Sequence, residues 1–211
     1  ASAQNQSDKL PDFLEIGVAN QRQVLEALAQ NDRQWQPRLV VHNDGRREYT
    51  YRLPKGAPEL SLPEIKALLR SPPDYSKDAE SITTLLTALN RYGVTVVIAE
   101  PNRAGASGEW NPRRGELRIS HSVVSKGTRS FRRVLSHEAI HVAQSCFGGS
   151  IRSRPRALGL SRGIDEQAML QLNGPVYAGM SSSQRLLEEE AYANQDELML
   201  GALLLDVHCR S

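Results

Sequence analysis

The 211-residue sequence has few cysteines, and this already limits the kinds of site that it can form. Only Cys146 and Cys209 are present, and neither lies in a CxxC or a zinc-finger spacing, so a cysteine-rich metal site is excluded. The two thiols could pair in an oxidising compartment or stay separate. The sequence favours neither alternative.

Long apolar runs and a strong charge of one sign are also missing. No stretch reaches the roughly 20 apolar residues of a membrane-spanning helix, so we expect no transmembrane segment. The formal net charge of +2 is too small to indicate a nucleic-acid partner, and we expect none. An apolar share of 39% and a charged share of 24% are ordinary for a soluble globular protein.

The chain begins with Ala1 and continues with small and polar residues, for which we expect disorder over residues 1–11. A first residue other than Met indicates a processed or an artificially expressed form. A secreted or periplasmic location is therefore one alternative for this soluble protein. The compartment and the oligomeric state stay open.

Hydrophobic periodicity and turn residues predict an α+β fold with an N-terminal α/β lobe over residues 12–92 and a second unit over residues 93–211. The expected elements are a helix over 12–30, a hairpin over 38–53, a capped helix after Ser61, a helix over 76–92, a strand over 94–100, a loop over 101–112, a strand over 116–124, a helix from Thr128 to Gly148, a short helix over 165–172 and a long final helix from Ser181 to about Leu205.

The most informative motif is His137-Glu138-Ala139-Ile140-His141. Residues four apart lie on one face of a helix, so His137 and His141 can bind one ion at about 2 Å. Glu138 lies about 100° round the axis, where it can contact a water on the metal. This division of roles is that of the HExxH zinc metalloproteases. The alternative is an ordinary helix with two satisfied histidines, but the apolar neighbours indicate burial, and buried polar groups need partners.

A catalytic zinc site needs a third protein ligand, and the best candidate lies in the segment LLEEEAYANQDEL. Glu190 shares a helical face with Ala191 and Asn194, which predicts a buried carboxylate that needs a cation. Asn194 could hydrogen-bond a metal-bound histidine from one turn away. Glu188 and Glu189 fall on the polar, solvated side of the same helix.

Together, HEAIH and EEAYAN resemble the zincin metallopeptidases, specifically the gluzincins, over roughly residues 94–205. The resemblance implies that His137 and His141 are metal ligands and that Glu138 is the catalytic residue. It also implies that Glu190 is the third ligand, because Ala-Tyr-Ala follows it. One Zn²⁺ per chain is implied, in a zincin-like fold whose small sheet and HExxH helix pack against a long C-terminal helix. The sequence departs from the compact members in the 48 residues between His141 and Glu190.

The expected activity is hydrolysis of peptide bonds in a peptide or protein substrate by a zinc-activated water, with Glu138 as general base. Tyr177 is the first candidate for a donor to the oxyanion of the transition state, and His121 is a weaker one. The strand ELRIS, at residues 116–120, is expected to pair with an extended substrate.

Two other functions stay open: a catalytically inactive zincin-like metal-binding scaffold, and a binder that holds an anionic partner through arginines. The arginines could be solvated charges or could recognise an acidic substrate or a terminal carboxylate. They form two clusters, Arg129, Arg132 and Arg133 before the histidines, and Arg152, Arg154, Arg156 and Arg162 after them.

Overall fold

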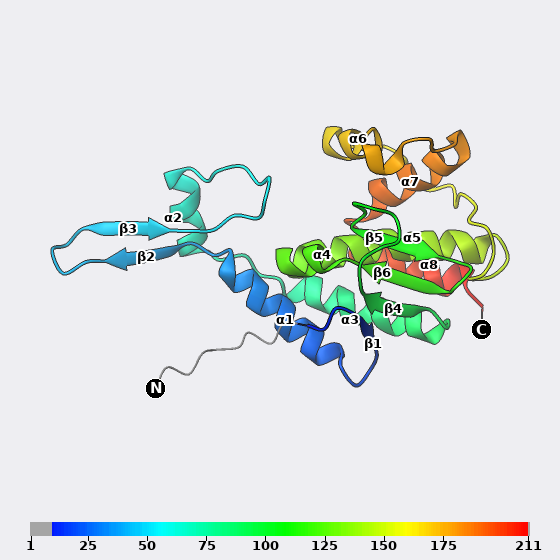
Figure 1. Ribbon diagram of the computed structural model, residues 1–211, viewed down its shortest axis with the longest axis horizontal. Coiled ribbons are helices and arrows are strands. Elements are labelled where there is room, and N and C mark those ends of the chain that lie inside the picture. Colours follow the sequence, from blue (N-terminus) through cyan, green and yellow to red (C-terminus); the bar gives the residue numbers. More distant parts are fainter. Residues whose placement is uncertain (1–9, 211) are drawn as a thin grey trace.

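Helix α5 (Thr128–Phe147), which carries the HExxH motif, runs through the centre of an α+β fold in the computed structural model, which describes residues 10–210 (Figure 1). Its apolar residues Phe131, Leu135 and Val142 are fully buried, as their helical spacing predicts. The helices that pack against α5 are α1 (Gln21–Gln34), α3 (Ser76–Arg91), α4 (His121–Lys126), α7 (Ser182–Asn194) and α8 (Leu200–His208).

A four-stranded sheet covers one side of α5. Its strands are β1 (Leu14–Ile16), β4 (Thr95–Ile98), β6 (Glu116–Ile119) and β5 (Gly108–Asn111), in that spatial order. Strand β4 is parallel to β6, and the two outer pairs are antiparallel. Strand β5 is therefore an edge strand, and β6 is an inner strand that pairs on both sides.

This sheet differs from the expectation at two points. The segment 101–112, expected as a loop, contains β5, because the turn before Gly115 folds residues 108–111 back onto β6. The strand expected over 116–124 ends at Ile119, and the chain continues as α4. His121 is consequently the first residue of a helix and does not lie on a strand.

One hydrophobic core extends across the boundary expected at residue 93. Strand β1 pairs with β4 across that boundary, and the α1 residues Val24 and Leu28 lie in the same core as Leu135. Asp32 of α1 also accepts hydrogen bonds from the backbone N–H and the hydroxyl of Thr128 at the start of α5. The residues before 93 thus fix the position of the motif helix. Of the segment expected to be disordered, residues 1–9 lie outside the described residues, and Leu10 is buried.

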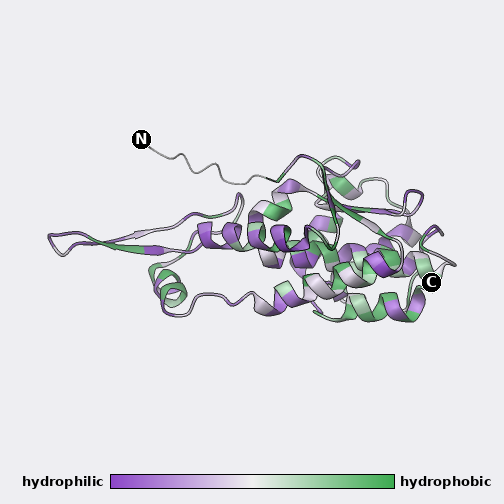
Figure 2. Cartoon of the chain, turned by 90° about the horizontal axis from the view of Figure 1, so that it is seen from below, coloured by the Kyte–Doolittle hydropathy of each residue, from purple (hydrophilic) through white to green (hydrophobic). Residues whose placement is uncertain are grey.

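The expected hairpin is present as β2 (Arg38–Val41) and β3 (Arg47–Thr50), and it extends away from the helical body in both views (Figures 1 and 2). Helix α2 (Leu62–Arg70) follows it and begins with the expected capping box, in which Ser61 and Glu64 bond reciprocally. Within residues 10–210, no helix is both long enough and apolar enough to cross a membrane.

The helices at the two ends of the chain differ most from the expectation. The first begins at Gln21 rather than near residue 12, because residues 14–16 join the sheet. The long final helix is two helices, α7 and α8, separated by residues 195–199. The carbonyl of Gln195, directly after α7, has a partner outside the helix, since Arg132 donates to it at 2.6 Å. The remaining short helices are α6 (Glu166–Leu172) and η1 (Pro175–Tyr177).

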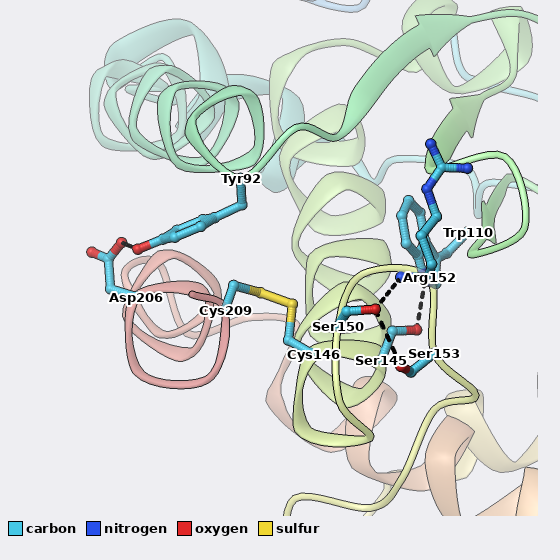
Figure 3. Close-up of a disulfide and its surroundings, with 9 residues drawn as sticks. All are labelled: Tyr92, Trp110, Ser145, Cys146, Ser150, Arg152, Ser153, Asp206 and Cys209. Carbon is cyan, nitrogen blue, oxygen red and sulfur yellow. Dashed lines mark hydrogen bonds between the residues drawn. A yellow bond between two sulfur atoms is a disulfide. The ribbon is translucent and has the colours of Figure 1, made fainter. Parts of the chain in front are cut away.

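A disulfide between Cys146 and Cys209 joins the C-terminal ends of α5 and α8 (Figure 3). The sequence left this pairing open. Both cysteines are buried, and α8 also contacts α3 through the hydrogen bond from the Tyr92 hydroxyl to Asp206. The cross-link connects residues 63 apart in sequence, so it fixes the end of the motif helix against the last helix of the chain.

We predict that replacing both cysteines by serine lowers the free energy of unfolding by about 2–4 kcal/mol, because a loop of this length loses its cross-link in the unfolded state. Urea unfolding of the double variant and of the wild type, with and without reductant, measures the difference. Reductant should lower the stability of the wild type and leave the double variant unchanged. Equal stability of all four samples would contradict the pairing.

Candidate functional site

Three side chains meet where α5 passes α7. His137 and His141 come from α5, and Glu188 comes from the middle of α7. The Nε2 atom of His137 lies 3.1 Å from a carboxylate oxygen of Glu188 and 3.1 Å from Nε2 of His141, and His141 Nε2 lies 3.4 Å from the same oxygen. The structure therefore brings the two histidines together, as the spacing predicts.

The third member of this cluster is Glu188 and not Glu190. Glu190 is buried, as expected, but its carboxylate accepts hydrogen bonds from the backbone N–H groups of Leu158, Gly159 and Leu160 at 2.6–2.9 Å. The prediction assumed one inward face on this helix. Instead, α7 is covered on two sides, by the segment 149–165 and by the cluster on α5. Glu190 faces the first and Glu188 the second.

The other ring nitrogen of each histidine is held by a glutamine. Nδ1 of His137 donates to the side-chain oxygen of Gln195 at 3.1 Å, and Nδ1 of His141 donates to that of Gln144 at 2.8 Å. With the proton on Nδ1, each Nε2 presents a lone pair to the shared space. Three electron-pair donors thus face one another, and a cation at their centre would stabilise the arrangement.

The glutamines are themselves anchored. The amide nitrogen of Gln144 donates to Glu190 at 2.9 Å and to the backbone oxygen of Leu187 at 3.1 Å. The backbone oxygen of Gln195 accepts from Arg132, whose guanidinium is buried against Asp78. Asn194, which we expected near a histidine, instead donates to Ser161 and to the backbone oxygen of Glu190.

The charges of the cluster depend on one another. Burial acts to raise the pKa of Glu188, but both histidines outweigh this effect and hold the pKa well below its usual range. Burial acts to lower the pKa of His141, and the Glu188 carboxylate outweighs it and raises the pKa to about 9. The cluster therefore attracts positive charge, whether a proton or a metal ion supplies it.

The residues fit a tetrahedral metal ion. Ligand atoms bound at 2.0–2.1 Å in a tetrahedral site lie about 3.3–3.4 Å from one another. The three atoms here are 3.1–3.4 Å apart. Two imidazoles and one carboxylate form a donor set that catalytic zinc sites use, with the fourth position left for water or substrate.

Glu138 is buried beside this cluster. Burial raises its pKa, and the two neighbouring histidines partly offset the rise. Its carboxylate lies against Gly108 of the edge strand β5, where an added Cβ would be 2.8 Å from the Glu138 oxygen and 2.7 Å from a Val134 methyl. A larger residue at this position would have to displace the side chains of Val134 and Glu138. Trp110, two residues on, ties β5 to α5 through a hydrogen bond to Ser145 (Figure 3).

A cavity of about 1010 Å³ opens onto these groups and is lined by His137, Glu138, His141 and Glu188. Strand β5 forms one wall. Tyr177 of η1, the expected oxyanion donor, also lines the cavity, and its hydroxyl lies 2.9 Å from that of Tyr192, whose ring packs edge-on against His137. Burial raises the pKa of Tyr177, so its hydroxyl stays protonated. His121 lies elsewhere, with Nε2 bonded to the backbone oxygen of Asp12.

Most arginines of the two clusters either form ion pairs or do not line the cavity. Arg129 and Arg132 pair with Asp78, and Arg133 pairs with Asp196 at 2.8 Å. Of the two clusters, only Arg133 lines the cavity. Arg103, which belongs to neither cluster, lines it as well.

No known protein family, curated protein or solved structure matches the chain. The resemblance to zincins therefore rests on the HExxH motif and on the residues of the site itself.

We predict that Glu188→Gln lowers zinc affinity at least about a hundredfold, because it would remove one of the three candidate ligand atoms, whereas Glu189→Gln changes it little. Glu190→Gln should chiefly destabilise the fold, by about 2–4 kcal/mol, because an NH₂ group replaces one of the two oxygens that accept from the backbone N–H groups of residues 158–160. Competition with a chromophoric chelator measures the affinity, and urea unfolding measures the stability. Loss of zinc in Glu190→Gln with retention in Glu188→Gln would restore the original assignment.

Proposed function

We propose that the protein is a zinc-dependent metallopeptidase whose metal ligands are His137, His141 and Glu188. The observation that carries the proposal is the position of Glu138, a buried carboxylate that lies beside this cluster, lines the same cavity and touches the edge strand of the sheet. A zinc ion held there would supply Lewis acidity, which polarises a peptide carbonyl and makes a water more acidic.

Glu138 supplies the proton transfers. Its carboxylate would take a proton from the attacking water and pass it to the departing amine. The raised pKa of Glu138 suits this role, since a base whose pKa lies closer to neutrality can both accept and return a proton.

Strand β5 would bind an extended substrate along its free edge. It is one of the two edge strands of the sheet, and residues 108–110 line the cavity. A peptide that adds to this edge is held through backbone hydrogen bonds. This role was expected for the strand at 116–120, but β6 is an inner strand with both edges paired.

The tyrosine pair supplies a hydrogen-bond donor. Tyr177 and Tyr192 share one hydrogen bond, so one of the two hydroxyl protons is free to point into the cavity. A free O–H at this position can stabilise negative charge that develops on a carbonyl oxygen.

We predict that Glu138→Gln keeps about one zinc per chain and loses cleavage of a mixed peptide pool by a factor of about 10²–10⁴. Elemental analysis of protein purified without chelator gives the metal content, and mass spectrometry of the digest gives the cleavage. Glu189→Gln, a change on the outer side of α7, serves as the control.

The other outcomes separate the alternatives. Digestion by Glu138→Gln at the wild-type rate contradicts the role of Glu138. Zinc binding by the wild type without cleavage of any peptide supports an inactive scaffold. Tight, salt-dependent binding of polyanions that survives chelator supports the arginine-mediated binder.

A further inference from the structure

Arg103 presents a cation with free donors to the cavity. It is exposed and lies between β4 and β5, with its guanidinium carbon 5.8 Å from the centre of the Tyr177 ring. Glu109 is close to it in sequence, but the Glu109 carboxylate bonds the backbone N–H of Arg103 and the side chain of Asn102. Within residues 10–210, no carboxylate forms an ion pair with the Arg103 guanidinium.

The segment that carries Arg103 meets η1 across the cavity. A Cβ at Gly105 would lie 3.5 Å from a Val176 methyl, so the two segments are in contact at this end. The Tyr177 ring lies beneath Arg103. The Tyr177 hydroxyl shares a hydrogen bond with that of Tyr192, whose ring packs against His137. Arg103 therefore lies at the end of the cavity that Tyr177 and η1 line.

The polarity of β5 indicates which end of a peptide would reach Arg103. The strand runs from Gly108 to Asn111, and Arg103 precedes Gly108. A peptide paired antiparallel with this edge has its C-terminal end beside Gly108 and the preceding segment. Glu138 touches Gly108, so the bond to be cut lies near Gly108, and Arg103 lines the same cavity.

We propose that Arg103 binds a carboxylate at the C-terminal end of the substrate, so that the protein releases short C-terminal fragments from peptides. The proposal rests on the peptidase function proposed above. Guanidinium groups bind carboxylates through a pair of hydrogen bonds. A peptide that paired with β5 in the same strand direction would instead bring its N-terminal ammonium group toward the Arg103 cation. Hydrolysis adds the hydroxyl of one water to the carbonyl carbon and its remaining proton to the amine of the released fragment.

The test compares zinc-loaded wild type with Arg103→Met and with Arg113→Met, an exposed arginine in the β5–β6 turn that does not line the cavity. The substrates are one cleavable peptide as the free acid, the same peptide as the C-terminal amide, and the amide with Asp as its last residue. We expect wild type and Arg113→Met to cleave a carboxylate-bearing peptide about tenfold or more faster than the plain amide, and Arg103→Met to lose this preference. The two acidic peptides distinguish a terminal carboxylate from a side-chain carboxylate.

A binding measurement separates failure of this proposal from failure of the peptidase function. Calorimetry gives the affinities of the acid and amide peptides for zinc-loaded Glu138→Gln, with and without Arg103→Met. Cleavage of acid and amide at equal rates, or a preference that survives Arg103→Met, overturns the carboxylate site and leaves the peptidase intact. Absence of cleavage, together with an Arg103-dependent preference in binding, supports the carboxylate site and overturns the peptidase. Absence of both overturns the two together.

Discussion

The structure depends on one electrostatic constraint: three electron-pair donors from two helices are held close together at the wall of a cavity, with both imidazoles largely buried. Two imidazole nitrogens and one carboxylate oxygen lie 3.1–3.4 Å apart, and glutamines hold the protons of both rings on the opposite side. Such a group is unfavourable in a buried site unless positive charge joins it. A metal ion would satisfy all three donors at once, and the Glu138 carboxylate beside them would then lie close to the metal.

The rest of the fold holds the two helices at this separation. The Gln144 side chain connects His141 to the buried Glu190 carboxylate, and that carboxylate in turn ties residues 158–160 to α7. On the other side, Arg132 and Asp78 fix the end of α7 that carries Gln195. The disulfide holds the far end of α5 (Figure 3). Residues before 93 also contribute, because Asp32 accepts a hydrogen bond from the first N–H of the motif helix and β1 pairs with β4 in the sheet.

Local sequence patterns correctly predicted those features that depend on residues close together in the sequence. The spacing of His137 and His141 placed both on one face, and the helix capped by Ser61 and the hairpin expected over 38–53 are both present. The choice of Glu188 over Glu190 depends on the segment 149–165, which covers a second side of α7. At the break after Asn194, the carbonyl of Gln195 accepts a hydrogen bond from Arg132, which is distant in sequence. A stripe at residues 188, 192 and 195 was visible as i, i+4 and i+7, and it could have indicated a polar face turned inward.

The most direct test of the account is a crystal structure of the zinc-soaked protein with diffraction recorded at the zinc absorption edge. We predict one anomalous peak per chain, about 2.0–2.2 Å from Nε2 of His137, Nε2 of His141 and a carboxylate oxygen of Glu188. Glu190 should keep its backbone partners. No peak at this position under saturating zinc, with the two imidazoles turned apart, would contradict the account.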